Sequence, residues 1–588
     1  MRKIVLSSAL SVSLVAATLA ATQTASSADP TSATTAGTVA GGTVVRTAGE
    51  YVVLYDEGTT DAVARAAIAA AGGTVVSSNE SVGYAFVRTD SEEFAARAEQ
   101  APGLLGAAAN RRIGTSPEGA DEADDAVERL TATVADAAAG VALQSSAGKG
   151  PKPARAEPLA DLQWDMAAID ATAEGSHAVQ QGSEKVSVGV IDTGIDGSHP
   201  DLAANFDAET SRNFVTDLPE VDGPCEVETC VDPADVDEGG HGTHVAGTIA
   251  AAVNGLGIAG VAPEVNLVNL RAGQDAGYFF LQPVLDAITF AGDAGIDVVN
   301  MSFYVDPWLY NCQANPADSP EEQAEQRVTV AAVQRAIDYA RSKGVLPVGA
   351  AGNAATDLGD PGVDVSSPNF PLDEEGDPVG ARERTIDNST CLSVPAESDG
   401  VVTVTSVGPS GRKAYYSNYG TEQADVAAPG GDAYDTPNGR VDVTAQVLST
   451  YPESVLAAEG AIDEDGEPTT ASVVREVTED GTSAYYRYLQ GTSMAAPHAA
   501  GVAALIVSEH GQEDPAHPGT LTLDPSLTEA LLLGTAQDVA CPVPAEFTYR
   551  RVTATGEVTS TATCAGPADV NGFYGQGVVN ALDAVTAF

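Results

Sequence analysis

The sequence predicts an α/β protein in which a parallel β-sheet is flanked by helices on both faces, preceded by a small α+β module. From residue 162 onward, short apolar runs typical of buried strands alternate with longer Ala-rich segments typical of helices. Such alternation is characteristic of parallel sheets. Before them, residues 50–105 follow a β-α-β-β-α order, which matches the split β-α-β, or ferredoxin-like, arrangement.

The first 28 residues have the pattern of a secretory signal peptide. Met1-Arg2-Lys3 supplies positive charge, and the Ala-rich apolar run that ends near Ala21 is too short for a membrane anchor. Ser26-Ser27-Ala28 provides small residues for cleavage before Asp29, and cleavage near Ala20 is an alternative. No later run holds about 18 uninterrupted apolar residues. We therefore expect a secreted, extracellular protein without a membrane anchor.

The α+β module is predicted at residues 29–115. Its pattern indicates strands at 50–55, 74–78 and 83–88 and helices at 61–71 and 92–100, with Gly72-Gly73 ending the first helix. Residues 116–157 are rich in Ala, Glu, Asp and Lys, show little apolar patterning and contain Gly148-Lys149-Gly150-Pro151. This composition predicts a flexible linker.

The larger domain is predicted at residues 158–588. Apolar runs indicate strands at 186–192, 264–271, 298–302, 344–350, 401–407 and 425–427. In an open parallel sheet, ligands bind beyond the carboxyl ends of the strands. Residues that follow these runs are therefore the first candidates for a functional site.

The net charge excludes some classes of partner. The chain carries 83 acidic and 28 basic residues, a formal net charge of −55. This charge argues against nucleic acid or an anionic membrane as partner. It favours solubility, and a uniformly acidic surface is most often simply a solvated one. We expect the protein to act as a monomer.

Six cysteines in a secreted chain indicate disulfides. Six cysteines allow fifteen pairings, so the sequence does not fix the connectivity. Pairing neighbours in the chain gives the simplest prediction: Cys225–Cys230, Cys312–Cys391 and Cys541–Cys564. The chain has no C-x-x-C pair, which argues against a zinc site or a redox motif.

Three short segments contain residues that could act together in catalysis. Asp192 ends a predicted strand, His241 opens a helix of small residues, and Ser493 lies in the first turn of an apolar helix. A lone serine there is most often a helix cap. An acid, a base and a serine in the order Asp…His…Ser instead match one of the orders known for the serine-protease triad.

The segments 190–194, 241–247 and 491–495 resemble the three catalytic blocks of the subtilisin-like serine proteases (subtilases, peptidase S8). The resemblance extends from 162 to 588 and includes Pro429-Gly430-Gly431. It implies a subtilisin-like fold and a serine endopeptidase that needs no cofactor for its chemistry. It also implies that Ser493 attacks the peptide carbonyl, that His241 accepts its proton and that Asp192 orients His241. The substrates are then proteins or peptides.

The same resemblance implies the oxyanion and substrate contacts. Asn353, after the strand at 344–350, matches the asparagine of the oxyanion hole, although an Asn after Gly alone would indicate a turn. The substrate-binding strands are implied to be Ser302-Phe303-Tyr304 and Ala350-Ala351-Gly352. Phe303-Tyr304-Val305 departs from the family's small, glycine-rich continuation, so the sequence does not fix the side-chain preference.

The module at 29–115 resembles the propeptide that precedes subtilase catalytic domains. The resemblance implies that this propeptide is an intramolecular inhibitor, removed by cleavage within 116–157. The sequence does not indicate which bond is cleaved.

A structural calcium ion is also implied by the family. Asp201 matches a calcium-ligating aspartate, and the loop 254–258, which begins with Asn254, resembles the calcium loop but is about one residue shorter. Calcium needs six or more oxygen ligands. The sequence therefore leaves a structural calcium site open.

An insertion at 451–487 precedes the nucleophile segment. Two alternating runs around Glu479-Asp480-Gly481 predict a β-hairpin. Two alternatives remain: the hairpin covers the site, or it extends the sheet.

Three functions are alternatives to a broadly active peptidase. A peptidase with one narrow target fits the same motifs. The complete triad and Asn353 argue against an inactive homologue that acts as a binding protein. An acidic adhesion protein would explain the charge but not three catalytic segments in order. The variant Ser493→Ala separates these classes, because only a peptidase would lose cleavage and its own maturation.

Overall fold

The computed structural model describes residues 49–110, 127–128, 157–219, 221–369, 380–478 and 481–587. The predicted signal peptide and nearly all of the predicted linker lie outside these residues. Within the described part of the chain, no helix combines the length and the apolar character needed to cross a membrane.

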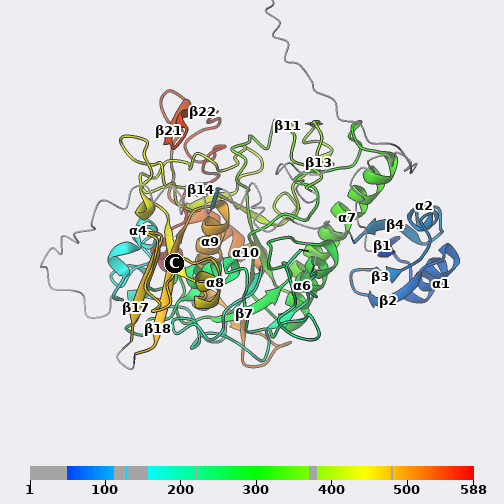
Figure 1. Ribbon diagram of the computed structural model, residues 1–588, viewed down its shortest axis with the longest axis horizontal. Helices are drawn as coiled ribbons and strands as arrows, with labels where there is room; N and C mark the ends of the chain where they lie inside the picture. Colours follow the sequence, from blue (N-terminus) through cyan, green and yellow to red (C-terminus); the bar gives the residue numbers. More distant parts are fainter. Residues whose placement is uncertain are drawn as a thin grey trace, which may run out of the picture. The chain divides into compact units, whose positions relative to one another are not determined.

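The N-terminal module is a four-stranded antiparallel sheet with strand order β2-β3-β1-β4 (Figure 1). Two helices pack on one face, where Ile68 and Phe94 meet Tyr51 and Val53. The predicted α+β order is confirmed, and a fourth strand, β4, follows the second helix. The elements are β1 (Glu50–Tyr55), α1 (Asp61–Ala71), β2 (Thr74–Asn79), β3 (Tyr84–Arg88), α2 (Phe94–Glu99) and β4 (Leu104–Ala109).

The larger domain is built on a seven-stranded parallel sheet with order β15-β14-β10-β8-β5-β7-β6. All six predicted strands are present. The seventh, β6, is two residues long, which is too short to leave an apolar pattern. The strands are β5 (Ser187–Ile191), β6 (Arg212–Asn213), β7 (Asn266–Arg271), β8 (Val298–Met301), β10 (Leu346–Ala350), β14 (Val402–Val407) and β15 (Val426–Pro429).

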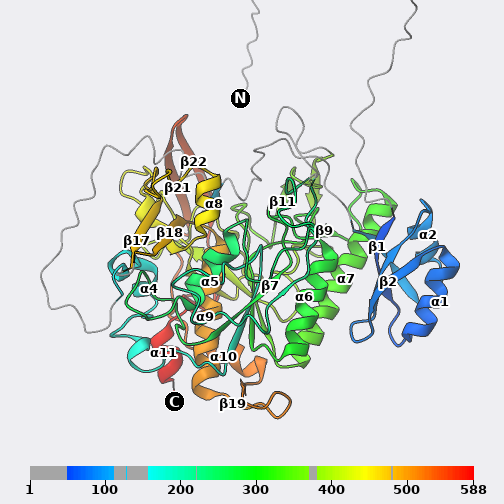
Figure 2. The same ribbon diagram turned by 60° about the horizontal axis from the view of Figure 1, so that its bottom comes forward.

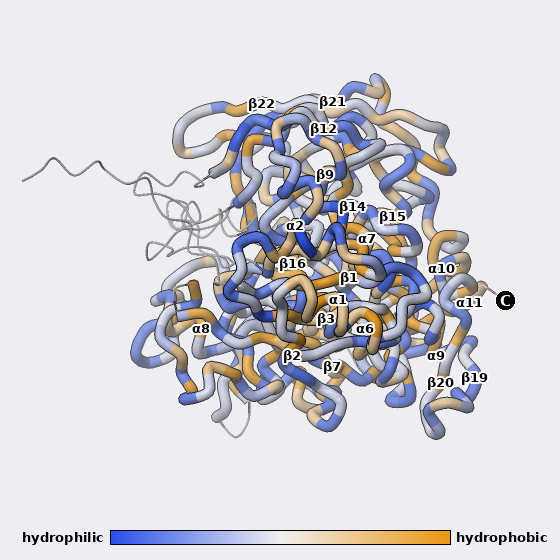
Figure 3. The backbone as a smooth tube through the Cα atoms, turned by 90° about the vertical axis from the view of Figure 1, so that its right-hand side faces the viewer, coloured by the Kyte–Doolittle hydropathy of each residue, from blue (hydrophilic) through white to orange (hydrophobic). Residues whose placement is uncertain are grey.

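Helices cover both faces of this sheet, as predicted (Figures 1 and 2). Along β5, Val188 and Val190 pack in the apolar cluster that includes α5 (His241–Ala250) and α9 (Thr492–His510). Ile191 packs in the opposite cluster, with α6 (Leu281–Ala294) and α7 (Pro320–Ser342). Because successive side chains of a strand point to opposite faces, apolar runs without polar alternation are what a sheet covered on both faces requires. In Figure 3 apolar stretches gather near α6 and α7, while many peripheral loops are blue.

The module packs against α6 and α7. Arg335 of α7 donates from Nη1 to the carbonyl oxygen of Tyr55 at 2.7 Å, and the Tyr84 hydroxyl bonds to Asp286 of α6. Leu54 and Ala108 belong to the same apolar cluster as these helices. Both helices therefore lie between the module's sheet and the parallel sheet.

The 451–487 insertion forms the predicted hairpin, β17 (Val473–Val477) with β18 (Ser483–Leu489). Strand β18 also pairs with β16 (Val447–Thr450), so a three-stranded antiparallel sheet forms beside the parallel one. The hairpin therefore does not extend the parallel sheet. A short helix, α8 (Glu453–Ala458), lies within the insertion.

The remaining elements are short. They are η1 (Ala160–Leu162), α4 (Trp164–Ala168), η2 (Ser176–Ala178), β9 (Asn311–Cys312), β11 (Gly362–Asp364), β12 (Arg384–Ile386), β13 (Cys391–Leu392), η3 (Val443–Ala445), β19 (Gln512–Glu513), β20 (Leu521–Thr522), α10 (Pro525–Gly534), β21 (Glu546–Thr553), β22 (Gly556–Thr563) and α11 (Ala581–Thr586).

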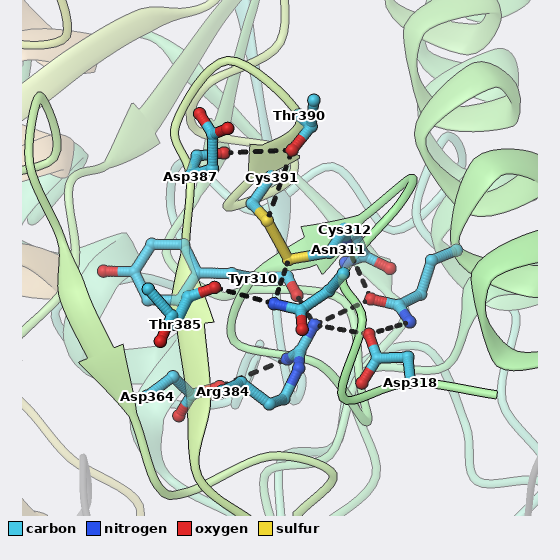
Figure 4. Close-up of a disulfide and its surroundings, with 12 residues drawn as sticks. Tyr310, Asn311, Cys312, Asp318, Asp364, Arg384, Thr385, Asp387, Thr390 and Cys391 are labelled. Carbon is cyan, nitrogen blue, oxygen red and sulfur yellow. Dashed lines mark hydrogen bonds and ion pairs between the residues drawn. A yellow bond between two sulfur atoms is a disulfide. The ribbon is translucent and has the colours of Figure 1, made fainter.

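All six cysteines form disulfides, and the predicted pairing of neighbours is confirmed. Cys312–Cys391 joins β9 to β13, which are paired strands in the segments that flank α7. Beside this bridge, the fully buried guanidinium of Arg384 lies between Asp318 and Asp364, 3.1 and 3.2 Å away (Figure 4). Two carboxylates thus hold this buried cation.

We predict that Arg384→Ala lowers the free energy of unfolding by about 3–5 kcal/mol, because it leaves buried Asp364 without its cation and leaves buried Asp318 with only the partly exposed Arg382. Denaturant unfolding in a Ser493→Ala background measures this without self-digestion. Arg550→Ala, which removes an exposed ion pair with Glu557, is the control and should change stability little. Equal effects of the two variants would contradict the prediction.

Candidate active site

The structure brings Asp192 and His241 into contact. Asp192 follows β5 directly and is fully buried. Its Oδ1 accepts hydrogen bonds from His241 Nδ1 at 2.7 Å and from the Thr193 N–H at 2.8 Å. A carboxylate oxygen can only accept, so the shared proton lies on Nδ1. In neutral His241 this leaves Nε2, on the other side of the ring, as the basic nitrogen.

His241 is the first residue of α5, and Gly240 before it allows this start. Gly240 has φ 83°, in the left-handed region that glycine adopts freely. A Cβ atom at this position would also lie 2.5 Å from the ring of Tyr451. The turn that places His241 at the start of α5 therefore requires glycine at position 240.

Asp237 ties the loop of Asp192 to the loop of His241. It is 2% exposed, and its Oδ1 accepts from the Thr193 hydroxyl at 3.0 Å and from the Gly240 N–H at 2.9 Å. Its Oδ2 accepts from the Thr243 N–H at 2.9 Å, in the first turn of α5. The sequence does not single out Asp237 as a site residue. The signal that could have found it is an acidic residue shortly before a helix start, which satisfies unpaired N–H groups there.

Ser493 is the second residue of α9 and is 6% exposed. Its backbone N–H belongs to the first turn, where N–H groups have no acceptor within the helix. Its hydroxyl points toward β8 and donates weakly to the Ser302 carbonyl oxygen, 3.4 Å away. The nucleophile candidate thus combines a partly accessible oxygen with an N–H group available to an anion.

Asn353 lies just beyond β10, and two hydrogen bonds fix the orientation of its side-chain amide. Its Oδ1 accepts from the Thr492 N–H at 2.9 Å and from the Thr492 hydroxyl at 3.0 Å. The amide nitrogen must therefore be the atom that faces the cleft. Asn418, which the sequence does not indicate, supports this loop: it donates to the Ala351 carbonyl at 2.9 Å and accepts from the Ala354 N–H at 3.1 Å.

A cleft runs over these residues. Five of the six predicted substrate-binding residues line it, and the sixth, Ala351, does not. The Ala351 N–H is bonded to Val404 of the neighbouring strand β14, and its carbonyl to Asn418. The lining includes Glu128, Thr193, His241, Asp275, Phe279, Ser302, Phe303, Tyr304, Leu309, Ala350, Gly352, Asn353, Ser393 and Ser493.

Two packing contacts accommodate the large side chains at 303–305, where the family has small residues. The Phe303 ring stacks on Phe279, with ring centroids 4.2 Å apart and planes 5° from parallel. Val305 is fully buried, and its N–H bonds to the Val394 carbonyl oxygen. The cleft wall therefore carries aromatic side chains where the family pattern has small residues.

Glu128, from the predicted linker, lies inside the cleft and was not expected there. It is 5% exposed. One carboxylate oxygen is 3.5 Å from His241 Nε2, and the other is 3.5 Å from Asn353 Nδ2. The carbonyl oxygen of Val127 accepts from Gln490 Nε2 at 3.0 Å. An acidic side chain of the N-terminal part thus occupies the space between His241 and Asn353.

This carboxylate changes the electrostatics of His241. Burial favours the neutral ring, but the carboxylates of Asp192 and Glu128 outweigh it and raise the pKa of His241 well above its usual value. Protonated imidazole cannot accept a proton from a serine. Glu128 in this position therefore favours the form of His241 that cannot act as a base.

The residues implied for calcium do not form an oxygen cage. Asp201 accepts from the Ile258 N–H and the Tyr486 hydroxyl on one oxygen and from Asn254 Nδ2 on the other, at 3.0–3.1 Å. The Asn254 side-chain oxygen accepts from the Leu256 N–H at 2.9 Å. The oxygens of both predicted ligands are thus already engaged by protein donors.

The loop 254–258 also presents N–H groups where calcium would need oxygens. The Gly255 N–H bonds to Glu157 at 2.8 Å, and the Gly257 N–H bonds to Glu476 of β17 at 2.7 Å. This arrangement does not fit the ion. A structural calcium ion at Asp201 and Asn254 therefore stays a prediction that these contacts do not support.

Glu476 also shows what the insertion contacts. It comes from the hairpin β17–β18, which contacts the 254–258 loop through Glu476 and α5 through a hydrogen bond between the Arg487 carbonyl oxygen and His244 Nε2. None of its described residues is among those that line the cleft. The alternative that the hairpin covers the site is therefore not supported by its position.

Comparison with known proteins identifies the family. The profile of the subtilase family, peptidase S8, matches residues 183–577. This region holds Asp192, His241, Asn353 and Ser493 and all seven strands of the parallel sheet. The chain belongs to the subtilase family, a class of serine-type endopeptidases.

Individual relatives are more distant. The thermophilic serine proteinase of Bacillus sp. (strain AK1) is 29% identical over 332 residues, 56% of this chain and 54% of that protein, so the chain spans about half of that relative's length. Subtilisin DY of Bacillus licheniformis is 29% identical over 329 residues, 55% of this chain and 77% of that protein. The structure of the epidermin leader peptide processing serine protease from Staphylococcus aureus shares the fold, with TM-score 0.56 and 21% identity over 91% of this chain and 97% of that one.

We predict that Asp237→Asn lowers the free energy of unfolding by about 1–3 kcal/mol, because an amide nitrogen replaces one acceptor and leaves buried N–H or O–H donors unpaired. It should also slow catalysis, because α5 would no longer hold His241 against Asp192. Asp235→Asn, an exposed change in the same loop, is the matched control. Denaturant unfolding and labelling by a fluorophosphonate measure the two effects. Wild-type behaviour of Asp237→Asn in both assays would show that the contact is dispensable.

Proposed function

We propose that this protein is a secreted serine endopeptidase, made as a zymogen that processes itself, and that it hydrolyses protein or peptide substrates. The observation that carries the proposal is the 2.7 Å bond between Asp192 and His241 beside a nucleophile candidate at a helix start. Asn353, with its amide nitrogen directed into the same cleft, supports it further.

Acylation follows from these positions. Ser493 Oγ attacks the carbonyl carbon of the peptide bond while His241 Nε2 takes the hydroxyl proton. Asp192 holds the imidazole and stabilises the imidazolium that forms. The negative charge on the former carbonyl oxygen is met by Asn353 Nδ2 and the Ser493 N–H. The imidazolium then gives its proton to the leaving amine, the C–N bond breaks, and the acyl group remains on Ser493.

Deacylation repeats these roles with water. His241 takes a proton from water, whose oxygen attacks the acyl carbon, and the proton is returned to Ser493 Oγ as the ester bond breaks. The products are the new carboxylate and the regenerated serine. The aromatic wall at Phe279 and Phe303 faces the substrate across the cleft.

Self-processing is supported by Glu128. This residue precedes the first described residue of the larger domain and contacts both His241 and Asn353. The intact chain therefore holds one of its own acidic side chains in the site. Cleavage within 116–157 would release it, lower the pKa of His241 and open the oxyanion site. The inhibitory contact comes from the linker, whereas the module at 49–110 packs on α6 and α7.

Secretion is proposed from the N-terminal pattern at residues 1–28, which precede the described part of the chain. Three disulfides fit an oxidising compartment.

We predict that the secreted wild type loses its N-terminal segment by a cut within 116–157 and gains the mass of one fluorophosphonate. Ser493→Ala should do neither, because both events need the same hydroxyl. Intact-mass spectrometry of the two proteins, with and without the probe, measures this. If the wild type stays unlabelled even after trypsin has removed the N-terminal segment, the proposed peptidase activity is wrong.

We also predict that Glu128→Gln lowers the pKa of His241 in the unprocessed chain. Removing a negative charge near Nε2 removes stabilisation of the imidazolium, so deprotonation occurs at lower pH. Histidine NMR in a Ser493→Ala background, where the chain stays intact, reports the value. Glu99→Gln, a change in α2 of the module, is the charge-matched control. An unchanged pKa of His241 would exclude Glu128 as the inhibitory group.

A further inference from the structure

Helix α9 lacks one of its own hydrogen bonds at the nucleophile. In an α-helix the N–H of residue i+4 donates to the carbonyl of residue i. The partner of the Ser493 carbonyl is therefore residue 497, which is Pro497. Proline has no N–H, and its ring crowds the carbonyl four residues before it. The Ser493 carbonyl is thus deprived of its helical donor in a buried environment, where an unpaired carbonyl is costly.

Ser302 supplies the missing donor from another element. Its hydroxyl donates to the Ser493 carbonyl oxygen at 3.0 Å. Ser302 follows β8 directly and is 6% exposed. In return the Ser493 hydroxyl donates weakly to the Ser302 carbonyl oxygen, at 3.4 Å. The residue of α9 proposed as nucleophile is therefore bonded to the end of a central strand through both its main chain and its side chain.

Asn300 fixes the direction of this bond. Its Nδ2 donates to Ser302 Oγ at 2.9 Å, and Asn300 is fully buried in β8. An amide nitrogen can only donate, so Ser302 Oγ accepts from Asn300 and its own hydrogen is left for Ser493. The two hydrogen bonds therefore run in one direction: Asn300 donates to Ser302, and Ser302 donates to the Ser493 carbonyl oxygen.

We propose that Ser302 is a positioning residue of the active site, whose hydroxyl replaces the helical donor that Pro497 removes. The first turn of α9 is thereby held to the sheet rather than only to its own helix. This fixes Ser493 Oγ and the Ser493 N–H relative to Asn353 and His241, which are also placed by loops at the ends of strands. The proposal rests on the proposed function, because it assigns a catalytic consequence to this contact.

The test is a double-mutant cycle on Ser302 and Pro497. Ser302→Ala leaves the Ser493 carbonyl unpaired, and the maximal rate of fluorophosphonate labelling should fall about 10- to 100-fold. The probe concentration for half-maximal rate should change little, because the contact is not made to the probe. Pro497→Ala restores an N–H at position 497, so the double variant should recover much of the lost rate. Pro497→Ala alone should cost less than Ser302→Ala.

The cycle separates positioning from simple loss of packing. If Ser302 acted only by filling space or by touching substrate, Pro497→Ala would not rescue Ser302→Ala, and the proposal would be overturned. Ser302→Thr, which keeps the hydroxyl, should retain more activity than Ser302→Ala. Equal losses for Thr and Ala would also count against the hydrogen bond.

A second readout does not depend on activity. The same four combinations in a Ser493→Ala background keep the carbonyl at position 493, and their unfolding free energies should show the same rescue. Coupling in stability without any coupling in labelling rate would refute the positioning role. A wild type that neither labels nor cleaves, even after trypsin treatment, would instead refute the proposed function, whatever the stability cycle shows.

Discussion

Every strand of the seven-stranded sheet runs in the same direction, and this constraint determines where the chemistry lies. The carboxyl ends of β5, β8 and β10 meet at one edge, so residues far apart in the chain become neighbours: Asp192 after β5, Ser302 after β8 and Asn353 after β10. Helices also begin at this edge. A chain that leaves one parallel strand must cross back to the start of the next, usually through a helix, so such a helix starts near the carboxyl ends of the strands. Thus His241 and Ser493 arrive at the beginnings of α5 and α9.

Polar side chains hold the loops at this edge in place. Asp237 accepts from N–H and hydroxyl donors in the loops of Asp192 and His241, and Asn418 accepts from the N–H of Ala354 in the loop of Asn353. The Ser302 hydroxyl donates to the Ser493 carbonyl oxygen, which has no helical donor because residue 497 is proline. In each case a side chain satisfies a buried polar group of a neighbouring loop or helix start. These contacts hold the geometry because leaving any of these groups unpaired would be costly.

The strong negative charge of the chain also has structural consequences. Buried cations are shared among several carboxylates: Arg271 with Asp217, Asp232 and Asp275 in the loop region before α6, and Arg384 in the disulfide-linked lobe. The same excess of acid allows a linker carboxylate, Glu128, to enter the cleft and pair with His241. This single acidic side chain helps to raise the pKa of His241 above its usual value.

Local sequence patterns predict the two domain folds, six of the seven parallel strands, the disulfide pairing as the simplest choice, and the segments of Asp192, His241 and Ser493. These features can be predicted because apolar periodicity and short motifs lie in consecutive residues. Three features are visible only in the folded chain: Glu128 enters the cleft, hydrogen-bond donors rather than carbonyl oxygens surround Asp201, and the 451–487 hairpin packs away from the cleft. Such contacts join residues tens to hundreds of positions apart, and their partners depend on packing that no local pattern records.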